Sequence, residues 1–90
     1  MGLAMKFSDT AVEAAERFSI GREIESGRYY LSIPVSNRLV DYEEYYEISQ
    51  AMHDSYPGNK AELRQFAAQC RARNNDHLLL VQPGKDRGAG

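Results

Sequence analysis

The chain has 90 residues, of which 42% are hydrophobic and 27% charged, and its formal net charge is −2. This is the length of one small domain with the composition of an ordinary globular protein, so a second hydrophobic core is excluded. The small net charge provides no overall attraction to nucleic acid or to an anionic membrane. The longest apolar run, residues 78–81, is far too short to span a bilayer, and the N-terminus lacks a secretory-signal pattern.

Cys70 is the only cysteine, which excludes an internal disulfide framework. A chain without disulfides suits a reducing compartment, so we expect a cytoplasmic protein. We expect residues 5–83 to form the single domain and residues 1–4 and 84–90 to be disordered ends. The last segment has no apolar side chain larger than alanine, so it has little surface to bury.

The first predicted element is a short helix over residues 10–18. Thr10 followed by Glu13 matches a capping box, in which each side chain satisfies a free backbone donor. Small apolar residues then recur at helical spacing (Ala11, Ala14, Ala15 and Phe18). Because that face is mostly alanine, this helix buries little area and is the weakest expected element.

Two strands are predicted next, over residues 19–25 and 29–36, joined by a turn at Ser26 and Gly27. The second strand alternates between an apolar face (Tyr29, Leu31, Ile33 and Val35) and a second face (Tyr30, Ser32 and Ser36). Such alternation is typical of a strand with one buried side. Pro34 cannot donate a hydrogen bond to a neighbouring strand, which places it at a sheet edge, a bulge or the strand exit.

Residues 39–49 are compatible with two structures. As a strand, one face carries Val40, Tyr42, Tyr46 and Ile48, interrupted by Glu44, and Glu43, Tyr45 and Glu47 point outward. As a helix, Asp41 would be the cap and the tyrosines would form one stripe. We predict the strand, because the preceding strand and the polar turn at residues 36–38 favour a hairpin. Together with the two strands before it, this gives a three-stranded meander.

The remainder of the chain predicts two helices and a strand. Ser49 can cap a short helix over residues 50–55, which Pro57 and Gly58 end. A longer helix follows from Asn59 to about residue 73, with one apolar stripe (Leu63, Phe66, Ala67 and Cys70). Residues 78–82 are a continuous apolar run, typical of a buried strand. The sequence therefore predicts an α+β domain, with a small three- to four-stranded, mostly antiparallel sheet and two or three helices packed on one face.

The segment around the second hairpin is the strongest candidate for a binding surface. Between Arg38 and Lys60 the sequence has five acidic residues and no Lys or Arg. Tyrosines provide large, stiff contact area at interfaces, and carboxylates would select a basic partner. We therefore expect a non-enzymatic interaction module that binds a protein partner, such as a target of inhibition, or a second copy of the chain. The expected binding residues are Tyr42, Glu43, Tyr45, Tyr46 and Glu47. The structural alternative is that Tyr42 and Tyr46 are core residues whose hydroxyls reach the surface.

Nucleic-acid binding is the alternative function. It would use basic residues against phosphates (Arg64, Arg71, Arg73, Lys85 and Arg87), with Tyr29 or Tyr30 stacking on bases. These cations are few, the acidic segment lies close to the tyrosines, and no recognition motif is visible, so the sequence favours the protein-binding interpretation.

The sequence offers little support for catalysis, a metal or a cofactor, and we expect none of them. Cys70 and His77 could form a thiolate pair, but Cys70 lies on an apolar helix face, where a buried, inert thiol is usual. The His53-Asp54 and Asp76-His77 pairs contain metal-ligand residue types, yet their spacing matches no metal motif.

Overall fold

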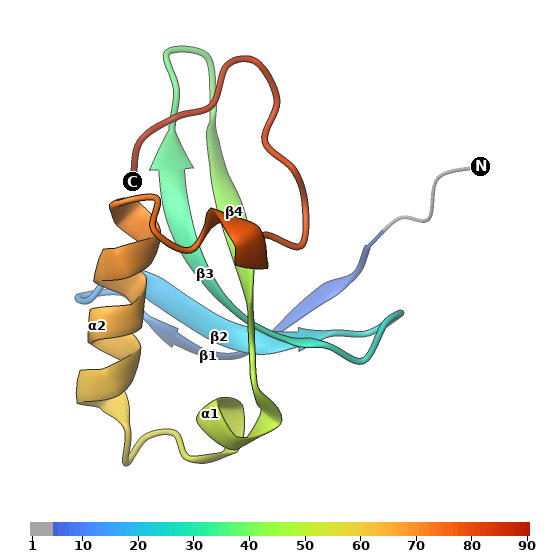
Figure 1. Ribbon diagram of the computed structural model, residues 1–90, viewed down its shortest axis with the longest axis vertical. Coiled ribbons are helices and arrows are strands. Elements are labelled where there is room, and N and C mark those ends of the chain that lie inside the picture. Colours follow the sequence, from blue (N-terminus) through green and yellow to red (C-terminus); the bar gives the residue numbers. More distant parts are fainter. Residues whose placement is uncertain (1–4) are drawn as a thin grey trace.

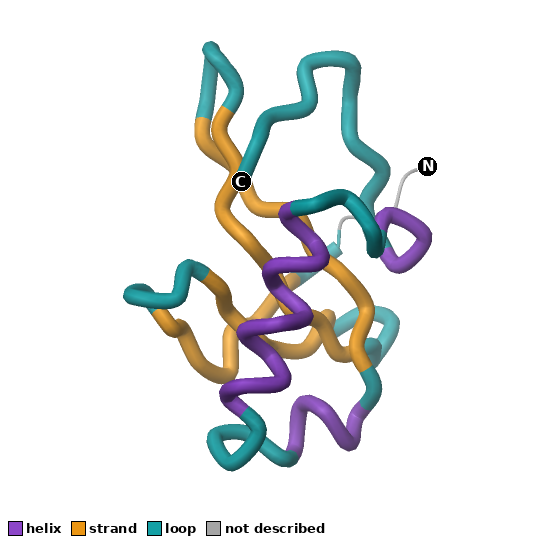
Figure 2. Tube along the Cα trace, turned by 60° about the vertical axis from the view of Figure 1, so that its left-hand side comes forward, coloured by secondary structure: helices purple, strands orange, loops and turns teal. Residues whose placement is uncertain are grey.

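The computed structural model describes residues 5–90. Its centre is a four-stranded antiparallel sheet in the order β1-β2-β3-β4, in which each strand pairs with the next along the chain. The strands are β1 (Phe7–Glu13), β2 (Phe18–Glu23), β3 (Tyr29–Ser36) and β4 (Asp41–Ile48). They are followed by α1 (Gln50–Asp54), α2 (Lys60–Arg71) and the 3-10 turn η1 (Asp76–Leu78). In Figures 1 and 2, α2 crosses the sheet on one side, and β1 and β2 run across the direction of β3 and β4.

We call the sheet face covered by α2 the inner face. The predicted stripe of α2 is confirmed: Leu63, Ala67 and Cys70 are buried, and Phe66 packs at the margin of the core. The strands contribute the other half of this core (Phe18, Ile20, Leu31, Ile33, Val35, Tyr46 and Ile48). Burying each large apolar side chain contributes about 1.5–3 kcal/mol, so α2 is held chiefly by this contact. Within residues 5–90, no helix has the length and apolarity to cross a membrane.

The predicted strand over residues 29–36 is confirmed by β3, and the strand interpretation of residues 39–49 is confirmed by β4. The two strands pair along their whole length, with Leu31 opposite Tyr46 and Val35 opposite Tyr42. The predicted short helix is also present, with the Ser49 hydroxyl accepting a hydrogen bond from the Met52 N–H at 3.1 Å. The helical part is smaller than expected, because α2 is the one helix of more than two turns in the described chain.

The predicted helix over residues 10–18 is wrong, because residues 7–13 form β1. Both residues of the supposed capping box are used elsewhere: the Thr10 hydroxyl lies 2.7 Å from Nε2 of His53, and Glu13 accepts a hydrogen bond from Tyr56. The ladder with β2 contains a bulge between Asp9 and Ala11. Local helix signals are weak, and here the pairing with β2 outweighs them.

The predicted strand over residues 78–82 is wrong as well. Only an isolated bridge joins Leu79 to Tyr46, and the Leu80 N–H donates to the Tyr45 carbonyl at 2.9 Å. Leu79 reaches the core from the turn that follows η1, whereas Val81 is exposed. Leu79 is the residue of this apolar run that the core buries, and placing one side chain there does not require a regular strand.

Residues 84–90, which we call the C-terminal segment, have defined contacts where composition predicts a disordered end. Ala89 forms an antiparallel bridge with Ser36 of β3, and the Asn37 side chain donates to the Asp86 carbonyl at 2.7 Å. Figure 1 shows this red segment passing from the β4 side to the end of β3. Bridging is available there because the pairing of β2 with β3 ends at Ser32, which leaves the far end of β3 with a free edge. The expectation of disorder for residues 1–4 falls outside the described part of the chain.

A buried carboxylate organises the turn between β2 and β3. Glu23 is 1% exposed and accepts hydrogen bonds from the backbone N–H groups of Lys6 at 2.7 Å, Ser26 at 2.6 Å and Glu25 at 3.1 Å. Hydrogen bonding from Ser26, followed by that from Lys6, lowers the pKa of Glu23 to about 2. This one side chain therefore fixes both the turn and the start of β1.

Candidate interaction surface

The side of the sheet opposite α2, which we call the outer face, is formed by alternate residues of all four strands. Cross-strand registers align Asp9, Gly21, Tyr30 and Glu47 in one row, and Ser19, Ser32 and Tyr45 in the next. The helix α2 packs on the inner face and does not cover this surface.

Three aromatic rings cluster at one end of the outer face. Phe7 stacks on Tyr45 with ring centroids 3.6 Å apart, and both meet Tyr30 edge to face, at 5.3 and 5.0 Å. Phe7 belongs to β1 and Tyr45 to β4, and two strands lie between them in the sheet order. Their contact therefore requires a strongly curled sheet. Tyr30 lies directly over Gly21, where a Cβ atom would come within 2.5 Å of the Tyr30 hydroxyl oxygen. Glycine at position 21 therefore makes room for the cluster.

Carboxylates surround this aromatic cluster. The Tyr30 hydroxyl donates to Asp9 Oδ1 at 2.5 Å, and Glu47 forms a 3.3 Å ion pair with Arg28. Partial removal from water raises the pKa of Glu43, and the neighbouring Asp9 charge adds to this, although a hydrogen bond from Ser32 acts in the opposite direction. Burial raises the pKa of Tyr45 too, with further contributions from Glu43 and Asp9. The outer face is thus a local region of negative potential.

A cavity of about 200 Å³ opens at the other end of the outer face. Its lining includes one residue from each strand (Val12, Ser19, Pro34 and Glu43) and also Arg17 from the β1–β2 turn. Val12 is 63% exposed, which is high for an apolar residue on a strand. The outer face therefore combines carboxylates, an aromatic cluster and a hollow lined by both apolar and polar residues.

The structure divides the five predicted binding residues between the two faces. Glu43, Tyr45 and Glu47 lie on the outer face, as the strand alternation predicts. Tyr46 is fully buried on the inner face, and Tyr42 is half-buried there, with its hydroxyl accepting a hydrogen bond from the Gly88 N–H at 2.7 Å. Both tyrosines therefore pack in or against the core, as the structural alternative predicts. The Tyr46 hydroxyl does not reach the surface, because it is buried and donates to Glu44.

Sequence reasoning missed two members of the outer face, Phe7 and Asp9. The available signal was alternation along residues 7–13, which places Phe7 and Asp9 on one side of a strand. The capping-box pattern in the same residues pointed to a helix instead.

Glu44, which interrupts the apolar face of β4, is the centre of a buried ionic network. Its carboxylate accepts hydrogen bonds from Arg87 Nε at 2.8 Å and from the Tyr46 hydroxyl at 2.7 Å. Arg87 also makes a bidentate contact with Asp76, both distances being 2.8 Å. This contact lowers the pKa of Asp76. Glu44 is thereby matched with a charge from a distant part of the chain.

Intramolecular contacts occupy four of the five cations of the nucleic-acid alternative. Arg87 is held in the Glu44 network, and Arg64 pairs with Glu16 at 3.1 Å. Arg71 donates to the Glu16 and Arg17 carbonyls, and Arg73 donates to the Gly88 carbonyl. Tyr30, one of the proposed stacking residues, is fully buried. The other, Tyr29, lies with its ring centroid 4.5 Å from that of His53. Three cations of this set, Arg73, Lys85 and Arg87, line a common cavity.

The residues considered for catalysis or a metal have other surroundings. Cys70 is buried, burial raises its pKa to about 11, and its sulfur accepts a 3.6 Å hydrogen bond from Asn75. His77 is exposed on η1. Nδ1 of His53 lies 2.8 Å from Asp54 Oδ1, so its two ring nitrogens contact Thr10 and Asp54. Thr10, His53 and Asp54 line neither the cavity on the outer face nor the cavity lined by Arg73 and Lys85.

Comparison of the chain with protein-family models, with curated proteins and with solved structures finds no match.

Proposed function

We propose that the protein is a protein-binding module whose outer face receives a basic, extended segment of another protein. The observation that carries this proposal is the pair of carboxylates, Asp9 and Glu43, beside Tyr45. Within residues 5–90 neither forms an ion pair. Removal from water raises the pKa of Glu43, and repulsion from the Asp9 charge adds to this. A lysine or arginine between them would relieve that repulsion, and it could also contact the Tyr45 ring.

The shape of the surface supports an extended occupant. Sheet faces present rows of side chains at regular spacing, so alternate residues of a bound segment could contact successive strands. The 200 Å³ cavity beside Val12 and Pro34 provides a place for one apolar side chain of the partner. Basic residues would then meet the carboxylates, and electrostatic attraction would speed association.

A second copy of the chain fits this surface less well. A symmetric dimer through the outer face would bring Asp9 and Glu43 of both copies together, and like charges across an interface are unfavourable. We therefore place the binding partner among other proteins with basic segments.

The test is a titration of the ¹⁵N-labelled chain with a short peptide of alternating lysine and threonine, compared with its glutamate–threonine counterpart. The lysine peptide should shift the amide signals of Asp9, Glu43 and Tyr45 and lower the pKa of the Glu43 carboxyl measured by NMR. Asp9→Asn and Glu43→Gln should each weaken binding about two- to five-fold, the effect of an exposed ion pair.

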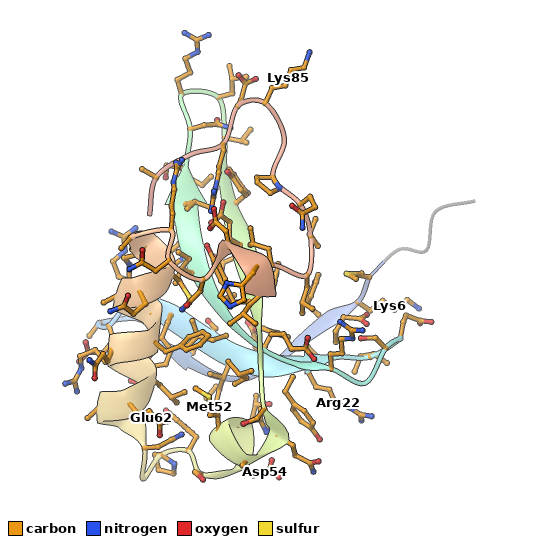
Figure 3. The ribbon with its side chains drawn as sticks, in the orientation of Figure 1. Lys6, Arg22, Met52, Asp54, Glu62 and Lys85 are labelled. Atoms are coloured by element: carbon orange, nitrogen blue, oxygen red, sulfur yellow. The ribbon has the colours of Figure 1, made fainter. Side chains whose placement is uncertain are left out.

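Glu62→Gln is the matched control, because Glu62 is an exposed carboxylate in the first turn of α2 (Figure 3). This variant should leave peptide affinity unchanged. Equal weakening by Glu62→Gln and Glu43→Gln would mean attraction to overall charge, and a Glu43 pKa that the lysine peptide leaves unchanged would refute the proposed site.

A further inference from the structure

A second cavity, of about 410 Å³, lies between the β3–β4 turn, the end of α2 and the C-terminal segment. We call it the basic hollow, because its lining includes Arg38 from the turn, Arg73 from the end of α2, and Lys85. Figure 3 shows Lys85 at the tip of its loop, beside the β3–β4 turn. The volume lies within the range of small-molecule sites.

None of these three cations forms an ion pair within residues 5–90. Of the eleven Lys and Arg residues in the sequence, five form ion pairs within residues 5–90, and three of the other six converge here. A fourth cation in the lining, Arg87, is neutralised by Glu44 and Asp76. Asp86 is the one carboxylate of the lining. The hollow is therefore positive in a protein whose net charge is −2.

Arg73 occupies a backbone position that normally belongs to glycine. It follows the C-cap Ala72 of α2, and its φ of 63° is in the left-handed region. The Arg73 N–H donates to the Cys70 carbonyl and the Asn74 N–H to the Gln69 carbonyl, both at 3.0 Å, which is a Schellman ending. A residue with a Cβ atom in this conformation costs about 1–2 kcal/mol. Its guanidinium is oriented toward the hollow by a 3.1 Å hydrogen bond from Nη2 to the Gly88 carbonyl.

We propose that the basic hollow binds the phosphate group of a small molecule, such as a phosphate ester or a diphosphate. Guanidinium groups donate paired hydrogen bonds that match phosphate oxygens, and a lysine ammonium adds a point charge. A phosphate ester carries a charge of about −1.5 to −2 at neutral pH. It therefore balances three convergent cations better than a ligand with one carboxylate group would. Strain retained at Arg73 is consistent with a functional position. This site is independent of the outer face and of the protein partner proposed above.

The test is a titration of the full ¹⁵N-labelled chain with inorganic pyrophosphate and with adenosine diphosphate, against sodium chloride at equal ionic strength. Saturable shifts are expected at Arg38, Arg73 and residues 85–89. Arg73→Gln and Lys85→Gln should each weaken binding about tenfold, the effect of removing one hydrogen-bonded charge. Arg17→Gln is the matched control, because Arg17 is exposed, has a φ of 58°, and lies outside the hollow.

Thermal unfolding of each variant separates binding from folding, and Lys85→Gln tests the proposal even if Arg73→Gln fails to fold, since Lys85 is exposed in a loop. No saturable shift with either phosphate compound would overturn the proposal, as would equal weakening by Arg17→Gln. Binding confined to single-stranded RNA, or to vesicles of phosphatidylcholine containing phosphatidylserine, would also overturn it. The proposal would be overturned as well if sedimentation experiments showed salt-sensitive self-association of the chain and phosphate did not affect that association.

Discussion

Replacing Arg87 with alanine tests whether the C-terminal segment is part of the folded domain. The substitution leaves the Glu44 carboxylate, whose side chain is 5% exposed, without its charged partner. Removing one member of a buried ion pair costs about 3–5 kcal/mol. Arg87 itself is 13% exposed and its second partner, Asp76, is 42% exposed, so the contact with Asp76 adds little. We therefore expect a loss of about 3 kcal/mol.

That loss is large for a domain of this size. Total stability is roughly 0.05–0.15 kcal/mol per residue, and each kcal/mol shifts the midpoint by about 4–8 °C in domains of 60–100 residues. The melting temperature of the Arg87→Ala variant should consequently fall by roughly 12–24 °C. Urea unfolding followed by circular dichroism gives the free energy directly.

Two further variants make this experiment decisive. Lys85→Ala removes an exposed cation from the same segment and should change stability by less than about 0.5 kcal/mol. Replacing both Glu44 and Arg87 with leucine removes the buried charges together and should recover most of the loss. If Arg87→Ala is no less stable than Lys85→Ala, or if the double variant is no better than Arg87→Ala, the reasoning fails.

Three other predictions concern the backbone and the turn carboxylate. The pKa of Glu23 lies below its ordinary value, so its stabilising effect is complete above about pH 4.5 and decreases as the pH falls toward 2. The difference in unfolding free energy between wild type and Glu23→Gln should shrink over that interval, and a pH-independent difference would contradict the assignment. Arg73→Gly should be about 1 kcal/mol more stable than Arg73→Ala in urea, because only glycine relieves the left-handed strain; equal stabilities would argue against that backbone conformation. Gly21→Ala should cost about 1–3 kcal/mol through overpacking against Tyr30 and Ser8, whereas Gly84→Ala, with open space around it, should be nearly neutral in the same assay; a neutral Gly21→Ala would exclude the packing described here.

Elements with strong periodicity could be predicted from the sequence. The alternation of β3 and the apolar stripe of α2 each repeat over several residues, so the signal outweighs local exceptions. The helix predicted for residues 10–18 is wrong because Thr10 and Glu13 match the pattern of a helix start. In the structure they contact His53 and Tyr56, which are distant in the chain. Local propensity carries no information about such partners.

The candidate site could be predicted only in part for the same reason. Alternation along β4 correctly placed Glu43, Tyr45 and Glu47 on one face, and Glu44 was recognised as an interruption of the other. Its partner Arg87 follows it by 43 positions, in a segment whose composition suggests disorder. A buried charge requires a partner, but the sequence alone does not say which cation supplies it.

The enclosure of β3 on both sides affects how the domain opens. Consecutive residues Tyr30, Leu31, Ser32 and Ile33 are all nearly inaccessible to solvent, since the aromatic cluster shields one side and α2 the other. Their amide hydrogens should therefore exchange with deuterium only when the whole molecule unfolds. The amides of β1 and of the C-terminal segment, which lie at the margins of the sheet, should exchange through smaller local openings. In this protein the second β-hairpin, together with α2, is expected to be the most persistent unit.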